Sequence, residues 1–269
     1  MRFVIKVGTG LLTNEDHQLN VAFLKRFIGD LAAMHADGHE IVIVSSGAVA
    51  AGRTSITFNH EDSSIPYRQT LAAVGQVMLM KTYDRYFEKH NVVVAQALLT
   101  NYDFVNKENS KNTRNVFELL LKKNVIPIVN ENDVTTIAEL QFGDNDMLSA
   151  KTAALINADF LIIVTSVDGL FTADPRKHPE AKFIPVVERI DAKIKKLAQG
   201  AGDKNSRGGM KTKLQAAEYV TEHGTPMFIV NGTNKSILKN IFKFCKQYSD
   251  EWKEALPDLP VGCTFFTEG

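Results

Sequence analysis

Short apolar runs rich in β-branched residues alternate with segments of helical pattern along most of the chain, and this alternation most limits the possible folds. Each apolar run is nearly continuous, as expected for strands buried on both faces of a parallel sheet. The predicted strands cover 3–7, 40–45, 92–98, 125–129, 160–164 and 226–230, and the predicted helices cover 20–36, 67–89, 113–123, 146–157 and 210–223. The order predicts an α/β protein, a three-layer α/β/α sandwich with a mainly parallel central sheet.

Composition and charge indicate an ordinary globular protein. The 269 residues are 44% hydrophobic, and 31 basic residues balance 31 acidic ones, so nothing favours nucleic-acid binding. The chain shows no internal repeat, and its length suits one large α/β domain or two small ones. Only two cysteines occur, Cys245 and Cys263, without metal-type spacing, which favours a reduced, cytoplasmic protein. We find no secretory signal and no apolar span, so no membrane association is expected.

Glycine turns follow the first two predicted strands, at the edge of the sheet where α/β proteins bind ligands. The first strand ends in K-V-G-T-G at 6–10, where Lys6 interrupts an apolar run and Gly8 permits close approach of a phosphate. A dinucleotide fingerprint would need glycine at the position of Thr13, so that interpretation is weak. The small-residue run at 45–52 suits an anion at a helix N-terminus, although a tight strand-to-helix turn would also explain it.

Polar residues are dense at three later strand or helix ends. The segments are N-E-N-D at 130–133, G-D-N-D-M-L-S-A at 143–150, the run from Thr165 to Arg176, and G-G-M-K-T-K at 208–213. Asp144 alone would suffice to cap a helix after 143–150, so Asn145 and Asp146 suggest a site for charged ligands, although a merely polar turn remains an alternative. The loops 54–66 and 199–209 are expected to be mobile and to lie at the ligand end of the sheet.

Known nucleotide motifs are absent. The glycine spacing before Lys211 does not fit a Walker A loop, and no protein-kinase H-R-D or D-F-G signature occurs. Basic residues, glycine turns and intervening acidic residues are nevertheless what phosphoryl transfer requires, because it needs cations on the phosphate and no covalent nucleophile.

In their order, the motifs closely resemble those of the glutamate 5-kinase family, which has the amino acid kinase fold. The resemblance covers about 3–266 and rests on K-V-G-T, S-S-G-A-V-A-A-G-R, A-A-V-G-Q at 72–76, N-E-N-D, G-D-N-D-x-L-S-A, G-L-F-T-A-D-P-R and G-G-M-x-T-K. A-A-V-G-Q and the pair N-E-N-D and G-D-N-D indicate this family in particular.

The resemblance implies ATP-dependent phosphorylation of the side-chain carboxylate of L-glutamate, the first step of proline biosynthesis. It implies Mg²⁺ with the ATP, without a protein ligand that we can name, and inhibition by proline. It also implies a single domain over 1–269, in which about 1–155 binds glutamate and about 156–269 binds ATP.

Site residues follow from the resemblance one by one. The catalytic residues are expected to be Lys6 and Lys213 on the phosphates, with Asp146 holding both ammonium groups. Glutamate is expected to contact Ser46, Gly47, Asp133 and Asn145, with Asp133 on the α-ammonium group. ATP is expected to contact Lys6, Gly8, Thr165, Ser166, Arg207, Gly208, Gly209, Met210, Lys211, Thr212 and Lys213.

The sequence departs from the family pattern at two positions and at its C-terminal end. Ser166 and Arg207 stand where family members often carry Asp and Thr, which puts the adenine contacts in doubt. The chain stops where many members continue into a PUA domain, so we expect a form with the kinase domain alone. The resemblance suggests a homo-oligomer using the helices 67–89 and 113–123, and functional coupling to glutamyl phosphate reductase. The alternatives are an acetylglutamate, uridylate or isopentenyl phosphate kinase, or a non-catalytic amino-acid sensor.

Overall fold

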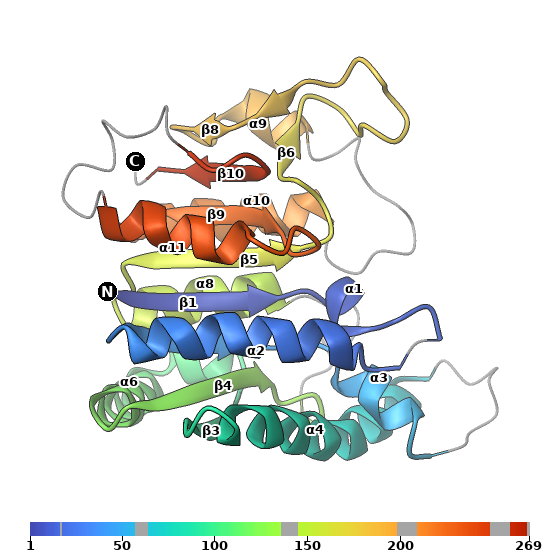
Figure 1. The fold of residues 1–269 in the computed structure, drawn as a ribbon, viewed down its shortest axis with the longest axis vertical. Helices are drawn as coiled ribbons and strands as arrows, with labels where there is room; N and C mark the ends of the chain where they lie inside the picture. Colours follow the sequence, from blue (N-terminus) through green and yellow to red (C-terminus); the bar gives the residue numbers. More distant parts are fainter. Residues whose placement is uncertain (17, 57–63, 136–144, 198–208, 248–258, 268–269) are drawn as a thin grey trace.

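The computed structural model describes residues 1–16, 18–56, 64–135, 145–197, 209–247 and 259–267. Within these residues, one eight-stranded sheet has the order β3-β4-β2-β1-β5-β9-β10-β8 (Figure 1). Neighbouring strands are parallel except β9 and β10, which run antiparallel. The strands are β1 (Arg2–Val7), β2 (Glu40–Val44), β3 (Val93–Leu99), β4 (Val125–Glu131), β5 (Phe160–Thr165), β8 (Val186–Val187), β9 (Met227–Asn231) and β10 (Cys263–Phe266).

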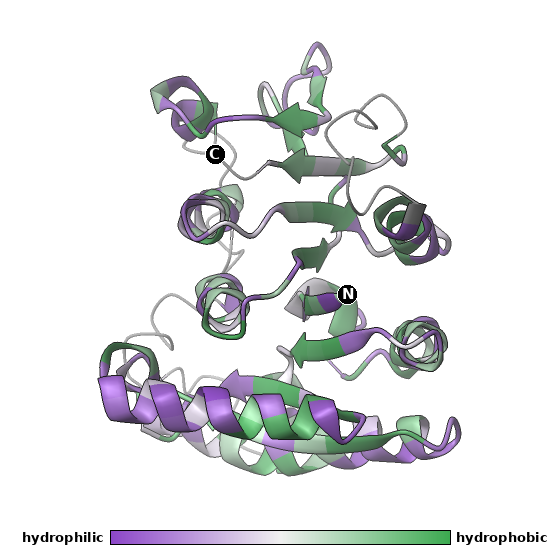
Figure 2. Ribbon diagram, turned by 90° about the vertical axis from the view of Figure 1, so that its left-hand side faces the viewer, coloured by the Kyte–Doolittle hydropathy of each residue, from purple (hydrophilic) through white to green (hydrophobic). Residues whose placement is uncertain are grey.

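Helices cover both faces of the sheet, so the predicted three-layer α/β/α sandwich is confirmed (Figure 2). One face packs against α2 (Val21–Ala36), α4 (Ile65–Glu88) and α11 (Ile237–Gln247), and the other against α6 (Lys107–Lys122), α8 (Asn145–Leu155) and α10 (Met210–Glu222). No helix of the described residues is long and apolar enough to cross a membrane.

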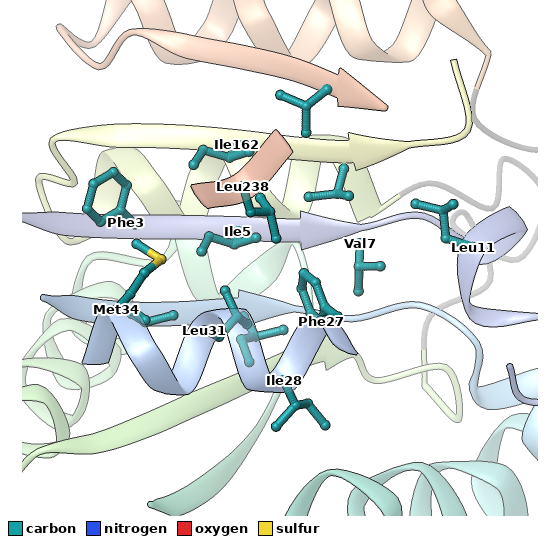
Figure 3. Packing of buried hydrophobic residues seen from close by; sticks show 14 of the residues in the cluster. Phe3, Ile5, Val7, Leu11, Phe27, Ile28, Leu31, Met34, Ile162 and Leu238 are labelled. Carbon is teal, nitrogen blue, oxygen red and sulfur yellow. The ribbon is translucent and has the colours of Figure 1, made fainter. Parts of the chain in front are cut away.

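Strand β1 shows how the two layers divide the side chains. Its residues Phe3, Ile5 and Val7 join the core beneath α2, where Phe27 and Leu31 meet them (Figure 3). Because side chains alternate along a strand, its even-numbered residues face the opposite layer. Val4 belongs to the second core cluster, and the same alternation turns the side chain of Lys6 toward α8 and α10.

Short elements complete the described fold. They are α1 (Thr9–Leu12), α3 (Ala48–Arg53), α5 (Tyr102–Val105), α9 (Ala192–Leu197), β6 (Leu170–Phe171) and β7 (Phe183–Ile184). Helix α9 has no buried residue, as its run of lysines predicts for a solvated face.

The predicted elements agree with the structure to within two residues at every end but one. Helix α6 begins at Lys107, well before the predicted start at 113, because Asn106 caps it by accepting hydrogen bonds from the amides of Glu108 and Asn109. The polar first turns of α6 carry no apolar period, so the sequence pattern does not reveal them.

Strand β3 is not buried on both faces, which corrects the sequence interpretation. Among the described strands it pairs only with β4 and so forms an edge of the sheet, and Val93 is 63% exposed. Strands β8 and β10 were not predicted, since each is short and is defined by its pairing across the sheet. Residues 57–63 and 199–208, within the two loops expected to be mobile, lie outside the described residues.

Helices α3 and α4 are in backbone contact, and this contact depends on glycine. A Cβ atom at Gly75 would lie 1.8 Å from the carbonyl oxygen of Ala48 and 2.3 Å from the amide nitrogen of Gly52. A Cβ atom at Gly52 would lie 2.0 Å from the carbonyl oxygen of Leu71. No larger residue fits at either position without separating the helices, which explains the glycine in A-A-V-G-Q.

We expect Gly75→Ala to destabilise the protein by about 1–3 kcal/mol or more, because overpacking forces the two backbones apart. Gly29→Ala is the matched control, since Gly29 lies in α2 and a Cβ atom there would meet no described atom within 4 Å. There alanine should stabilise by roughly 0.5–1 kcal/mol through helix propensity. Urea unfolding measures both free energies, and equal effects of the two substitutions would contradict the proposed helix contact.

Candidate active site

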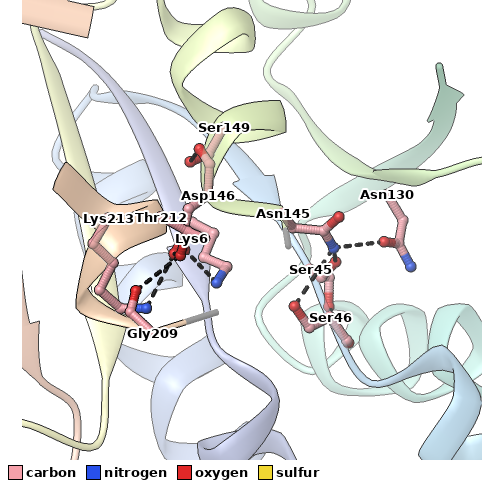
Figure 4. Close-up of polar contacts among 10 residues, drawn as sticks. All are labelled: Lys6, Ser45, Ser46, Asn130, Asn145, Asp146, Ser149, Gly209, Thr212 and Lys213. Carbon is pink, nitrogen blue, oxygen red and sulfur yellow. Dashed lines mark hydrogen bonds and ion pairs between the residues drawn. The ribbon is translucent and has the colours of Figure 1, made fainter. Parts of the chain in front are cut away.

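The polar residues singled out from the sequence gather at the carboxyl edge of the sheet, where the helices α8 and α10 begin. Lys6 lies on β1 between Val44 of β2 and Ile163 of β5. Figure 4 shows two groups of side chains there, a charged group around Asp146 and an amide group around Asn145. Because Asn145 and Asp146 are adjacent at the start of α8, the two groups are joined by one helical turn.

The charged group consists of one carboxylate between two lysines. Lys6 Nζ lies 2.5 Å from Asp146 Oδ1, and Lys213 Nζ lies 3.0 Å from Asp146 Oδ2. Asp146 is fully buried and each lysine is only 5% exposed. Two ammonium groups and one carboxylate leave an excess positive charge in a poorly solvated place, which favours an anionic ligand.

The helix starts hold this carboxylate in place. Asp146 lies in the first turn of α8, where the helix dipole favours a negative charge. Thr212, near the start of α10, has its hydroxyl 3.1 Å from Asp146 Oδ2 and 2.8 Å from the carbonyl oxygen of Gly209. The Ser149 hydroxyl donates to the backbone oxygen of Asp146 at 2.6 Å. The first turns of α8 and α10 are therefore linked through Asp146.

The amide group centres on Asn145. Its Nδ2 donates to the carbonyl oxygen of Ser45 at 2.6 Å and to Asn130 Oδ1 at 2.8 Å, and it lies 3.5 Å from Ser46 Oγ. Gly47 follows with a φ of +95° and begins α3, a backbone conformation that favours glycine. Asn145 therefore fixes the turn between β2 and α3 against β4.

Tyr83 supports the same turn from α4. Its hydroxyl lies 3.0 Å from Ser45 Oγ, and Ser45 Oγ also donates to the carbonyl oxygen of Ser46 at 3.0 Å. Burial raises the pKa of Tyr83 well above its ordinary value, so the phenol keeps its proton and can donate to Ser45 at neutral pH.

Some of the residues expected to contact a nucleotide lie around the ends of β1 and β5. The amide of Gly8 donates to the carbonyl oxygen of Val164 at 2.9 Å, and a Cβ atom at Gly10 would lie 3.8 Å from Ser166 Oγ. Ser166 is exposed and Thr165 partly so. Gly209, Met210 and Lys211 lie at the start of α10, whereas Arg207 and Gly208 lie outside the described residues.

The structure adds contacts to those expected from the sequence. Asp133 lies partly buried in the turn after β4. Asn130 and Gln76 belong to two of the sequence motifs but were assigned no role, yet Asn130 joins Asn145 to Gln76. Their polar type inside buried segments was the signal that could have identified them. Thr212, expected only near ATP, also contacts Asp146.

No group of three or more His, Cys, Asp or Glu side chains that could bind a metal ion occurs among the residues that the structure describes. Asp146 is already paired with two lysines. Mg²⁺ keeps several waters and binds phosphates readily, so it can enter such a site on a nucleotide with few or no protein ligands.

The site combines two buried lysines on one aspartate with glycine turns at the carboxyl edge of a parallel sheet. This combination is typical of an enzyme that transfers phosphoryl groups. The model of the amino acid kinase family matches residues 1–231. The chain belongs to the amino acid kinase family.

Within the amino acid kinase family, the chain is similar to several proteins named glutamate 5-kinase. The chain is 41% identical over 243 residues to the glutamate 5-kinase of Clostridium acetobutylicum, covering 90% of this chain and 91% of that protein. It is 45% identical over 241 residues to the glutamate 5-kinase of Deinococcus radiodurans, covering 90% of this chain and 66% of that protein. The glutamate 5-kinase of Caldanaerobacter subterraneus is 41% identical, and the chain spans 65% of its length.

Solved structures agree on the fold. An isopentenyl phosphate kinase superposes with a TM-score of 0.62 at 16% identity, covering 99% of this chain and 100% of that one. The UMP kinase from Ureaplasma parvum gives a TM-score of 0.61 at 14% identity, covering 99% of this chain and 98% of that one. At such low identity these likenesses establish the fold alone.

We expect Lys6→Ala and Lys213→Ala each to lower kcat for phosphoryl transfer by about 100-fold or more while changing the acceptor KM by less than about threefold. The reason is that a cation on a developing charge acts mainly in the transition state. Arginine should not restore the rate, because its planar group cannot replace a compact ammonium. Lys25→Ala, an exposed lysine of α2, is the control, and near-normal kcat in either site variant would contradict the assigned role.

Proposed function

We propose that the chain transfers the terminal phosphoryl group of ATP to the side-chain carboxylate of L-glutamate, giving L-glutamyl 5-phosphate and ADP, the first step of proline biosynthesis. The observation that carries the proposal is the buried Asp146 between Lys6 and Lys213, next to an amide-lined turn. Relatives named glutamate 5-kinase at 41–45% identity support the choice of acceptor.

The chemistry needs charge stabilisation and no covalent enzyme intermediate. An oxygen of the glutamate side chain attacks the γ-phosphorus, a new P–O bond forms, and the bond to ADP breaks. Lys6 and Lys213 neutralise the phosphoryl oxygens, and Asp146 keeps both ammonium groups aimed at them. Mg²⁺ supplies further positive charge on the ATP phosphates.

The two substrates would approach from the two sides of Asp146. We assign Ser46, Gly47, Asp133 and Asn145 to glutamate, with Asp133 on the α-ammonium group. ATP would meet Gly8, Thr165, Ser166 and the start of α10, together with Arg207 and Gly208. In this proposal about 1–155 binds glutamate and about 156–269 binds ATP, with Lys6 and Gly8 of the first part also meeting the ATP phosphates.

A substrate panel tests the proposed function. The purified chain is incubated with Mg²⁺ and ATP, and ADP release is followed with L-glutamate, N-acetyl-L-glutamate, UMP or isopentenyl phosphate as the only varied acceptor. Hydroxylamine is included in parallel, because it converts an acyl phosphate to a stable hydroxamate. Glutamate-dependent ADP release with matching hydroxamate supports the proposal, and turnover with another acceptor in place of glutamate contradicts it.

A homo-oligomer is part of the proposal. Exposed apolar side chains lie on the edge strand β3 and on α4 and α6, namely Val93, Val77, Met78, Val116 and Leu119. Helices α4 and α6 include the ranges 67–89 and 113–123 expected to form the contact, apart from one terminal residue of each. Sedimentation velocity should give the mass of a dimer or a larger assembly, and a monomer at micromolar concentration would contradict this part.

The expected product also suggests a partner. An acyl phosphate is a mixed anhydride that water and nearby amines attack, so a glutamyl phosphate reductase that takes it directly would protect it. In the test, the kinase and the reductase are mixed with glutamate, ATP and NADPH, and the rate of NADPH oxidation is measured. Functional coupling predicts a faster rate than when the reductase is given glutamyl phosphate that was made beforehand and separated from the kinase. Equal rates would contradict coupling.

We expect L-proline to raise the apparent glutamate requirement with little effect at saturating glutamate, because proline shares the α-carboxylate and amino nitrogen of glutamate. The groups assigned to those ends, Ser46, Asp133 and Asn145, can hold either ligand. Initial rates with glutamate varied at several fixed proline concentrations measure the effect. Unchanged rates at millimolar proline and low glutamate would contradict proline inhibition and leave the kinase assignment intact.

A further inference from the structure

Three side-chain amides form a hydrogen-bonded row across three elements behind the turn between β2 and α3, which we assign to glutamate. Gln76 on α4 accepts from Asn130 Nδ2 at 2.9 Å, and Asn130 on β4 accepts from Asn145 Nδ2 at 2.8 Å. Gln76 is 8% exposed and Asn130 3% exposed. Figure 4 shows the two members nearest the site, with the oxygen of Asn130 directed at the nitrogen of Asn145.

One backbone group determines the direction of every amide in this row. The amide nitrogen of Glu131 donates to Asn130 Oδ1 at 2.9 Å. A backbone N–H can only donate, so the oxygen of Asn130 must lie on that side and its NH₂ group on the other. Asn130 therefore presents an acceptor to Asn145 and a donor to Gln76.

Asn145 has no freedom to turn its amide over. Its nitrogen faces Asn130 Oδ1 and the carbonyl oxygen of Ser45, and both of these groups accept. A reversed amide would place its oxygen against two oxygens and lose both hydrogen bonds. The Asn145 carbonyl oxygen consequently points away from these acceptors, as Figure 4 shows.

The arrangement leaves one hydrogen-bond donor of Gln76 unpaired among the described residues. Its Nε2 atom is buried and has no hydrogen-bond partner among the described residues. Reversing Gln76 would direct its NH₂ group at the NH₂ group of Asn130, so the orphan donor is retained although such a group costs about 1–3 kcal/mol. Gly75, the residue before Gln76, lies against the backbone of α3. This contact fixes how close Gln76 comes to the turn between β2 and α3.

We propose that Gln76 and Asn130 are positioning residues that fix the Asn145 amide so that its oxygen, an acceptor, faces the ammonium group of the amino-acid substrate. This inference rests on the proposed function, because it identifies which end of the acceptor meets Asn145. Neither Gln76 nor Asn130 contacts the substrate in this arrangement; both act through Asn145. The row thereby selects acceptors with a free ammonium group.

Two substitutions of Gln76 separate the amide role from packing. In Gln76→Glu a carboxylate still accepts from Asn130 and needs no donor, so kcat/KM for glutamate should stay within about threefold of the wild-type value. In Gln76→Leu the Asn130 NH₂ group loses its acceptor, and KM for glutamate should rise about tenfold, the effect of one neutral hydrogen bond. The kcat and the KM for ATP should change little in both.

A double-mutant cycle provides the decisive measurement. Asn145→Ala alone should lower kcat/KM for glutamate strongly, and adding Gln76→Leu should lower it by less than about twofold more, because Gln76 acts only through Asn145. Thr152→Val is the matched control: Thr152 is buried in α8 and donates to the carbonyl oxygen of Leu148 at 2.8 Å. It should lower Tm without changing KM for glutamate.

The outcomes distinguish this inference from the proposed function. Multiplicative effects of Gln76→Leu and Asn145→Ala in an active enzyme would overturn the inference alone, as would Gln76→Glu being as harmful as Gln76→Leu. A wild-type chain that does not phosphorylate glutamate would overturn the proposed function and this inference with it. Near-wild-type kcat/KM in Gln76→Glu together with a non-additive cycle supports the positioning role.

Discussion

The interaction on which the site depends is a single buried carboxylate shared by two buried ammonium groups. Lys6, Asp146 and Lys213 come from β1, α8 and α10, so the fold has to bring three segments that are distant in sequence to one point. Burying such charges is not the most stable solution, since apolar residues of similar volume often fit better. The excess positive charge is therefore best understood as a site prepared for phosphate.

The amide row complements this charged group on the other side of the same helical turn. Asn145 and Asp146 are neighbours, yet one is fixed by neutral donors and acceptors and the other by lysines. An acceptor amino acid can thus be oriented by directional hydrogen bonds while the phosphate is held by charge. In the proposed site, helix α4 supports the orientation of the acceptor through Gln76 and Tyr83.

Much of the fold was predictable because the six main strands are continuous apolar runs that are bounded by turns. The start of α6 and the short strands β8 and β10 were not predictable, since a polar first turn and a short pairing segment leave no periodic pattern. Strand β3 was assigned correctly but its exposure was not, because the position of a strand in the sheet is a tertiary property.

The site followed mostly from motifs. Lys6 and Asp146 stood out as charged residues at the ends of apolar or helical segments, and the structure brings both together with Lys213. Gln76 was not identified because its polar type inside a buried helical segment shows that it needs a partner but not which partner it has. The positioning role proposed for it depends on the direction of a backbone N–H in β4, which the sequence does not show.

The central claim is that Asp146 holds both lysines where the phosphoryl group passes, and the most direct measurement is kcat of Asp146→Asn. Asparagine keeps the size and one acceptor but removes the charge that orients the two ammonium groups. We expect kcat to fall by about 1,000-fold with circular dichroism and a cooperative unfolding transition preserved. A folded Asp146→Asn variant with kcat within about tenfold of the wild-type value would contradict the account.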